Sequence, residues 1–88
     1  MALKELIQSV SKDIEILNSY TKKSIFGMNI DYVFFKIGNR YYLVSKSESD
    51  FYVLTEQTAD GSKDISRPKT FEEIGLKEYI KKLLILEN

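Results

Sequence analysis

Residues 25–56 hold eight of the eleven aromatic side chains in this 88-residue chain, and this concentration constrains the fold more than any other feature of the sequence. Isoleucine and valine occupy many of the positions between the rings. Aromatic and β-branched residues favour a pleated, half-buried strand. Gly38-Asn39 and the polar stretch 47–50 interrupt the segment as turns do. The segment predicts an antiparallel meander with strands at about 30–37, 40–46 and 51–57.

Two further details of the meander follow from glycine. Asp60-Gly61 is a hairpin signal, and it leaves open a short fourth strand at about 62–66, with Ile65 as its only apolar anchor. Gly27 is expected to form a bulge near the start of the first strand, because glycine tolerates the conformation that a bulge requires.

The N-terminal segment has a different periodicity. Within residues 2–18 the apolar side chains recur at the i, i+3, i+4, i+7 spacing of one helix face, which Ile16 and Ala2 do not share. The spacing predicts a helix over 2–18 that packs on the sheet, followed by a linker at 21–24. The residues of the stripe are Leu3, Leu6, Ile7, Val10, Ile14 and Leu17.

A second helix is predicted at the C-terminal end. Pro68 ends the strand region, and Thr70 with Glu73 matches a capping box, in which each side chain satisfies an amide of the first turn. The helix is expected to run to about Leu86, with Gly75 as its weakest point. Its apolar face comprises Leu76, Tyr79, Ile80, Leu83 and Leu84.

These elements predict one domain over residues 1–88, of the α+β class. The order is α-β-β-β-(β)-α, a three-stranded meander or, with the short strand, a four-stranded one. We expect both helices on one face of the sheet, because one face has the more continuous apolar floor. If one helix instead covers each face, no sheet face stays open.

The two-residue turn at Gly38-Asn39 sets which side chains share a face. Partners across it sum to 77, so Val33 faces Val44 and Phe35 faces Tyr42. Pairing Val44 with Val53 extends the pattern to the third strand, although a slip of one residue would exchange the faces. The face away from the helices would then be a partner-binding surface, and its candidate residues are Tyr32, Phe34, Tyr41, Leu43, Tyr52 and Leu54.

Composition excludes most catalytic and metal chemistry. The chain has no Cys and no His, so nucleophilic triads and zinc sites built on those residues cannot form within it. Its glycines make no phosphate loop or dinucleotide fingerprint. The stretch Asp60–Asp64 begins like a calcium loop, but Ile65 and Phe71 stand where such a loop needs Gly and Glu. We expect no catalytic residue, cofactor or metal, although a catalyst built on Lys, Tyr or Glu stays open.

The sequence therefore favours a small non-catalytic interaction module, of adaptor, immunity or inhibitor type, that binds a protein partner or itself. Single-stranded nucleic acid is a less favoured partner, through Tyr32, Phe34 and Tyr41 with flanking Lys36 and Lys46, because the net charge is zero. A structural homo-oligomer or ligand-binding fold is a third hypothesis. Apolar runs are far shorter than the roughly 20 residues of a membrane span, and charged residues at the N-terminus interrupt the apolar region that a signal peptide needs. Because cysteine is also absent, we expect a cytoplasmic protein with no membrane partner.

Overall fold

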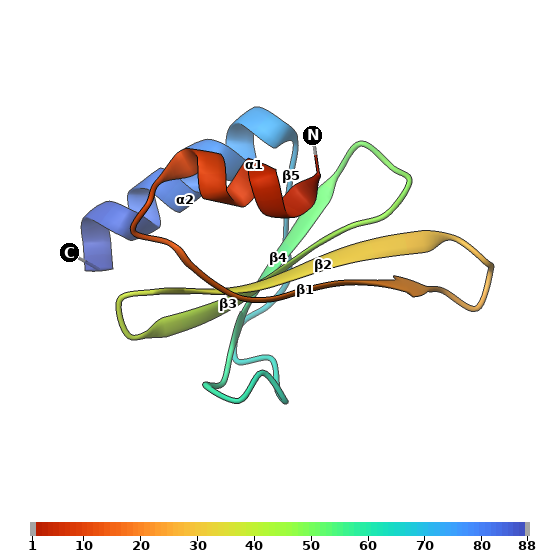
Figure 1. Cartoon of the computed structure of the whole chain (residues 1–88), viewed down its shortest axis with the longest axis horizontal. Helices are drawn as coiled ribbons and strands as arrows, with labels where there is room; N and C mark the ends of the chain where they lie inside the picture. The colour runs from red at the N-terminus through yellow and green to blue at the C-terminus, as the bar shows by residue number, and fades with distance from the viewer. Residues whose placement is uncertain (1, 88) are drawn as a thin grey trace.

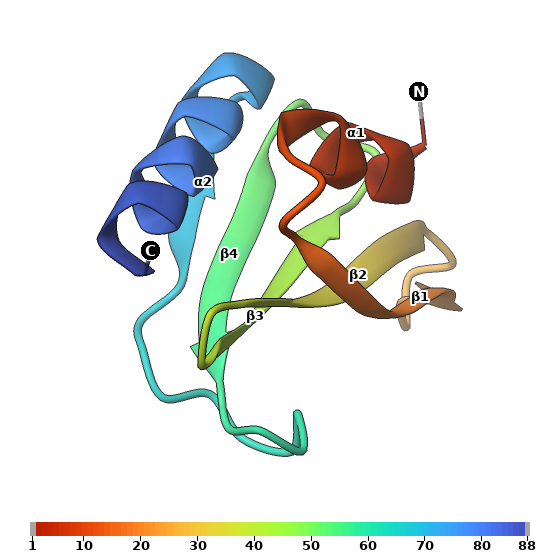
Figure 2. The ribbon, with the colours of Figure 1, turned by 60° about the vertical axis from the view of Figure 1, so that its left-hand side comes forward.

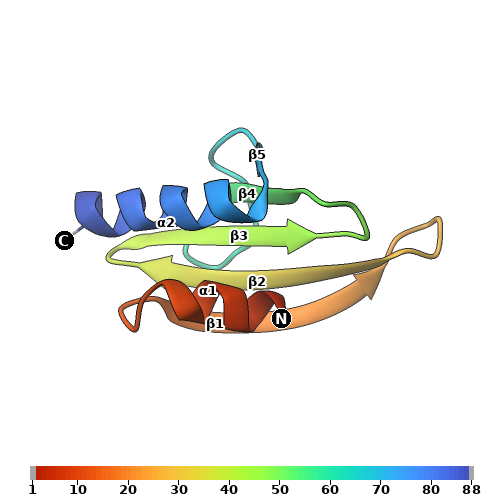
Figure 3. The ribbon, with the colours of Figure 1, turned by 90° about the horizontal axis from the view of Figure 1, so that it is seen from above.

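The computed structural model describes residues 2–87, which form a five-stranded antiparallel sheet and two helices (Figure 1). Neighbours in the sheet are neighbours in the chain, in the order β1-β2-β3-β4-β5. Both helices lie on one face of the sheet (Figures 1 and 3), which confirms the α+β architecture predicted from the sequence. The elements are α1 (Leu3–Val10), β1 (Glu15–Lys23), β2 (Asn29–Ile37), β3 (Arg40–Lys46), β4 (Tyr52–Gln57), β5 (Lys69–Phe71) and α2 (Glu73–Glu87).

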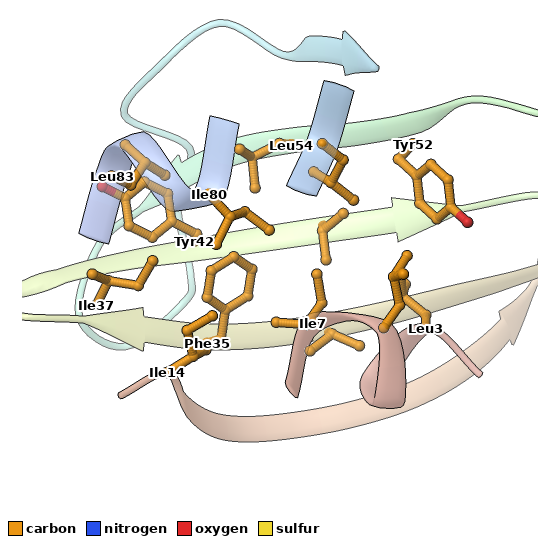
Figure 4. Packing of buried hydrophobic residues seen from close by; sticks show 14 of the residues in the cluster. Leu3, Ile7, Ile14, Phe35, Ile37, Tyr42, Tyr52, Leu54, Ile80 and Leu83 are labelled. Carbon is orange, nitrogen blue, oxygen red and sulfur yellow. The ribbon is translucent and has the colours of Figure 1, made fainter. Parts of the chain in front are cut away.

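The core lies between the sheet and the two helices (Figure 4). Alternate residues of β2 (Val33, Phe35 and Ile37) point to the helix side, and each is at most 1% exposed. Ile7 of α1 and Ile80 of α2 are 0% exposed in the same cluster. The helices are therefore held by burial of their apolar side chains against one face of the sheet, which we call the shared floor. Neither helix in the described part of the chain has the length and apolar character that crossing a membrane would require.

The N-terminal helix is shorter than predicted. It ends at Val10, because Ser11 is extended, with φ −164° and ψ 149°, and residues 15–23 form the edge strand β1. The predicted helix over 2–18 and the linker at 21–24 are therefore wrong in this part. As a strand the segment supplies hydrogen-bond partners along β2. It also brings Ile16, which the helical stripe had left out, against the core.

The β2–β3 hairpin has the predicted register throughout. Val33 lies opposite Val44, and Phe35 opposite Tyr42. Gly38 has a φ of +59°, whereas no non-glycine residue in the described range has a positive φ. Glycine alone in the left-handed region, at the first central position, is typical of a type II′ turn, whose twist matches that of the strands. A two-residue turn of this kind fixes the register, and so fixes the faces.

The β4 register differs from the prediction by one residue. Val44 lies opposite Leu54, not Val53, so Tyr52 and Leu54 point to the helix side. They are 8% and 3% exposed and belong to the core. The connection over 47–51 is long enough to permit either register. The observed one buries Leu54 under the helices and places Thr55 and Gln57 on the other face.

The C-terminal elements also differ from the prediction. Thr70 lies in β5, opposite Val53, so it does not cap α2, which begins at Glu73. The stretch 62–66 makes only an isolated bridge, Gln57 to Asp64. The sheet is completed by β5, because this pairing directs Phe71 toward the core. The centroid of the Phe71 ring lies 4.9 Å from that of Tyr79.

Truncation of Phe35 to alanine tests the shared floor. Phe35 is 0% exposed, and removal of a buried phenyl ring from a core costs about 3–5 kcal/mol. We expect Phe35→Ala to lose most of the stability of so small a domain in urea unfolding. The control Phe26→Ala removes a ring that is 82% exposed and should change the unfolding free energy by less than about 0.5 kcal/mol. Equal effects of the two variants would contradict the observed core.

Candidate functional site

The face of the sheet opposite the helices carries a cluster of rings that neither helix covers. Strand pairing sets Tyr20 beside Tyr32, and Phe34 beside Leu43, on this side. Tyr41 belongs to the same side, because its neighbours in the chain, Arg40 and Tyr42, point the other way. We call this surface, formed by Tyr20, Tyr32, Phe34, Tyr41 and Leu43, the aromatic face. It spans three adjacent strands, and four of its five members were predicted from the sequence.

Ring stacking orders the aromatic face. The Tyr20 and Tyr32 rings stack with centroids 5.1 Å apart, and the Phe34 and Tyr41 rings with centroids 6.0 Å apart. Such offset pairs restrict the side-chain rotamers. The rings are therefore held in place before any partner arrives, which reduces the entropy lost on binding.

Two lysines lie over these rings. The Lys22 ammonium is 5.4 Å from the Tyr20 ring centroid, and that of Lys36 is 5.6 Å from the Tyr41 centroid. Each is a cation–π contact in which the aliphatic part of the lysine also covers ring surface. Lys46, which the sequence had paired with this face, lies over the ring of Tyr52 instead, at 5.5 Å.

The aromatic face is half-buried, not fully open, because a loop crosses one end of it (Figure 2). A Cβ added at Gly61 would lie 3.2 Å from Cζ of Phe34, so the backbone of the loop rests on that ring. The Gln57 side chain donates to Thr55 and to Asp64. These bonds connect the loop to β4. They also give hydrogen-bond partners to the Thr55 and Gln57 side chains, which are buried on this side of the sheet.

Tyr52 and Leu54 were predicted on this surface, and the β4 register removes them from it. The Tyr52 hydroxyl donates to the Glu73 carboxylate of α2 at 3.5 Å. Burial, and then the nearby Glu73 charge, raises the pKa of Tyr52 above its ordinary value. Tyr20 is the member that sequence reasoning missed. The alternation Asn18-Tyr20-Lys22 would have indicated it, once the segment was read as a strand.

Asp60 organises the turn of the covering loop. Its carboxylate accepts from the Thr58 hydroxyl at 2.7 Å, from the Ser62 hydroxyl at 2.7 Å and from the Ser62 amide at 3.0 Å. These bonds lower the pKa of Asp60 from 3.8 to about 2, the Thr58 bond having the largest effect. Asp64 is directed to Gln57 instead. Within residues 2–87 no three carboxylates gather as a metal ligand set.

Two of the surface recesses lie on opposite sides of the sheet. One of about 130 Å³ lies on the aromatic face, beside Tyr20, Phe34 and Asp60. The other, of about 270 Å³, lies on the helix side, where Arg40 and Glu56 form an ion pair at 3.0 Å.

Comparison of the chain with family models, with curated proteins and with solved structures gave no match. The interpretation of the surface therefore rests on its own geometry and chemistry.

Two glycine variants test whether the loop rests on the aromatic face. Gly61 and Gly27 have φ of +71° and +81°, so alanine at either costs about 1 kcal/mol in backbone strain. Only Gly61→Ala also pushes against Phe34, since nothing lies within 4 Å of Gly27. We expect Gly61→Ala to be the more destabilising and to shift the NMR signals of the Phe34 ring. Unchanged ring signals would show that the loop does not pack there.

The Asp60 carboxyl gives a prediction for pH. Its folded-state pKa lies below the ordinary value of 3.8, so its contribution to stability is present above about pH 4 and is lost as the pH falls through about 2. Carbon-detected NMR should give a midpoint near 2 for this group, and Thr58→Val should raise it. A midpoint at the ordinary value, with no response to Thr58→Val, would contradict the turn geometry.

Proposed function

We propose that this chain is a small non-catalytic interaction module, of adaptor, immunity or inhibitor type, that binds a protein partner or a second copy of itself through the aromatic face. The observation that carries the proposal is a continuous group of rings on three strands that both helices leave uncovered. Tyrosine suits such a surface, because it buries a large area and keeps a polar tip. The absence of cysteine fits a reducing compartment, and we propose the cytoplasm.

Because the rings are half-buried, the aromatic face would form a flat contact with its partner. Each ring already packs against a neighbour on one side, so a partner would cover only the outer edges and the hydroxyl groups. The Lys22 and Lys36 ammonium groups border the rings, and they give such a contact a polar rim. An apolar centre with a charged border is the usual composition of a protein interface.

The two lysines also favour one alternative, binding of single-stranded nucleic acid. Bases stack on exposed aromatic side chains while nearby cations contact the phosphates. The Asp60 carboxylate at the edge of the same face opposes phosphate, and the net charge is zero. Retention on an oligonucleotide column that weakens steeply with salt would favour this alternative.

The variant Tyr32→Ser with Tyr41→Ser tests the proposal. It removes one ring from each stacked pair and leaves Phe34 under the loop. We expect a loss of at least about tenfold in affinity for the partner, because central aromatic residues dominate interface energies. Light scattering measures self-association, and quantitative capture from the native host measures a heteromeric partner.

The matched control changes two other exposed apolar residues. Ile74 and Ile85 on α2 are 72% and 77% exposed, and Ile74→Ser with Ile85→Ser should leave binding unchanged. If the α2 variant abolishes binding and the double tyrosine variant does not, the contact lies on the helix side and the proposal is wrong.

A further inference from the structure

The tip of the β1–β2 hairpin carries three exposed large apolar side chains, more than any other turn among the described residues. Ile25 is 94% exposed, Phe26 is 82% exposed and Met28 is 41% exposed. The hairpin extends along the longest dimension of the molecule, 40 Å, and its tip projects beyond the other loops at that end (Figures 1 and 3). Large apolar side chains grouped in this way usually mark a contact surface.

Most amides of the tip have hydrogen-bond partners within the turn. The Ser24 amide donates to the Met28 carbonyl at 2.8 Å, and the Gly27 amide donates to the Ser24 carbonyl at 3.0 Å. The Ser24 hydroxyl oxygen accepts from the amides of Phe26 and Met28 at 3.3 and 3.2 Å. Four of the five amides in the turn therefore have a partner within it. When such a turn is transferred out of water, these amides keep their hydrogen-bond partners.

Cations lie next to the apolar tip. Lys22 and Lys23 precede it on β1, and both are exposed. Asp31, across the hairpin, accepts from the Thr21 hydroxyl at 2.7 Å. The β3–β4 connection, which holds Glu48 and Asp50, is at the same end of the sheet but does not extend as far as the tip (Figure 3). A surface reached first by the tip therefore meets apolar side chains and then Lys23, with Lys22 one residue further along β1 and its ammonium 5.4 Å from the Tyr20 ring centroid.

We propose that this tip inserts into the surface of an anionic lipid bilayer. Hydrocarbon offers no hydrogen-bond partner, so a segment that approaches it is favoured when its amides are paired internally, as four of the five amides of this turn are. Apolar side chains with basic residues beside them bind the boundary between acyl chains and anionic headgroups. The expectation of no membrane partner rested on the length of a spanning segment, and a hairpin tip acts peripherally. The inference does not rest on the proposed function of the aromatic face, although Lys22 borders both surfaces.

Flotation with vesicles tests the proposal on the full chain. One vesicle contains phosphatidylcholine alone, and the other contains equal parts of phosphatidylcholine and phosphatidylglycerol. We expect binding to the anionic vesicle, and a bound fraction at least about fivefold lower for Ile25→Ser with Phe26→Ser, since each lost side chain removes apolar burial. The variant Ile74→Ser with Ile85→Ser is the control and should bind as the parent does. Lys22→Gln with Lys23→Gln should lose the preference for anionic lipid.

Fluorescence gives a second readout that does not depend on loss of binding. The chain has no tryptophan, so Phe26→Trp introduces a single reporter at the tip and Ile74→Trp a matched one on α2. We expect anionic vesicles to shift the emission of the first to the blue and to leave the second unchanged. Circular dichroism should show the same fold for all variants, because the altered side chains are exposed.

Three outcomes would overturn the proposal. The parent chain fails to float with anionic vesicles, the tip variant floats as well as the parent, or Phe26→Trp shows no blue shift. If the parent ignores both vesicles and the tip variant lowers the mass seen by light scattering, the tip contacts a second copy instead.

Discussion

Two amphipathic helices bury their apolar sides on one floor, and most other features of the molecule follow from that burial. The alternating side chains of β2 and β3 supply the floor, with Phe35 at its centre and residues of both helices around it. Because both helices use the same face, the opposite face has only a loop to cover it. The half-buried rings of the aromatic face follow from this arrangement, since no further apolar element of the described chain is left to pack on them.

The molecule therefore presents two apolar surfaces of different kinds. The aromatic face is broad, lies on three strands and is ordered by stacking of its rings. The hairpin tip is small, projects from the body and exposes Ile25 and Phe26 almost fully. A broad half-buried face suits a flat partner, whereas a narrow tip whose amides are mostly paired suits insertion. The β1–β2 hairpin contributes to both, and Lys22 lies between them.

The aromatic face illustrates how far local sequence reaches. The two-residue turn at Gly38-Asn39 fixes the pairing of β2 with β3, and so Tyr32, Phe34, Tyr41 and Leu43 could be placed on one face without coordinates. The five-residue connection before β4 has no such restriction. One residue of slip there exchanges inside and outside, and it moves Tyr52 and Leu54 from the predicted surface into the core.

Local stereochemistry and composition were enough to establish the α+β class, the central hairpin with its register, and the absence of cysteine and histidine chemistry. The other elements depended on interactions between distant parts of the chain. Residues 15–18 fell within the predicted helix and residues 21–23 within the predicted linker, yet 15–23 form a strand because β2 offers hydrogen bonds along its edge and Ile16 reaches the core there. Phe71 likewise draws its segment into β5. In both cases a local preference, which is weak in free energy, is outweighed by burial and by pairing with remote residues.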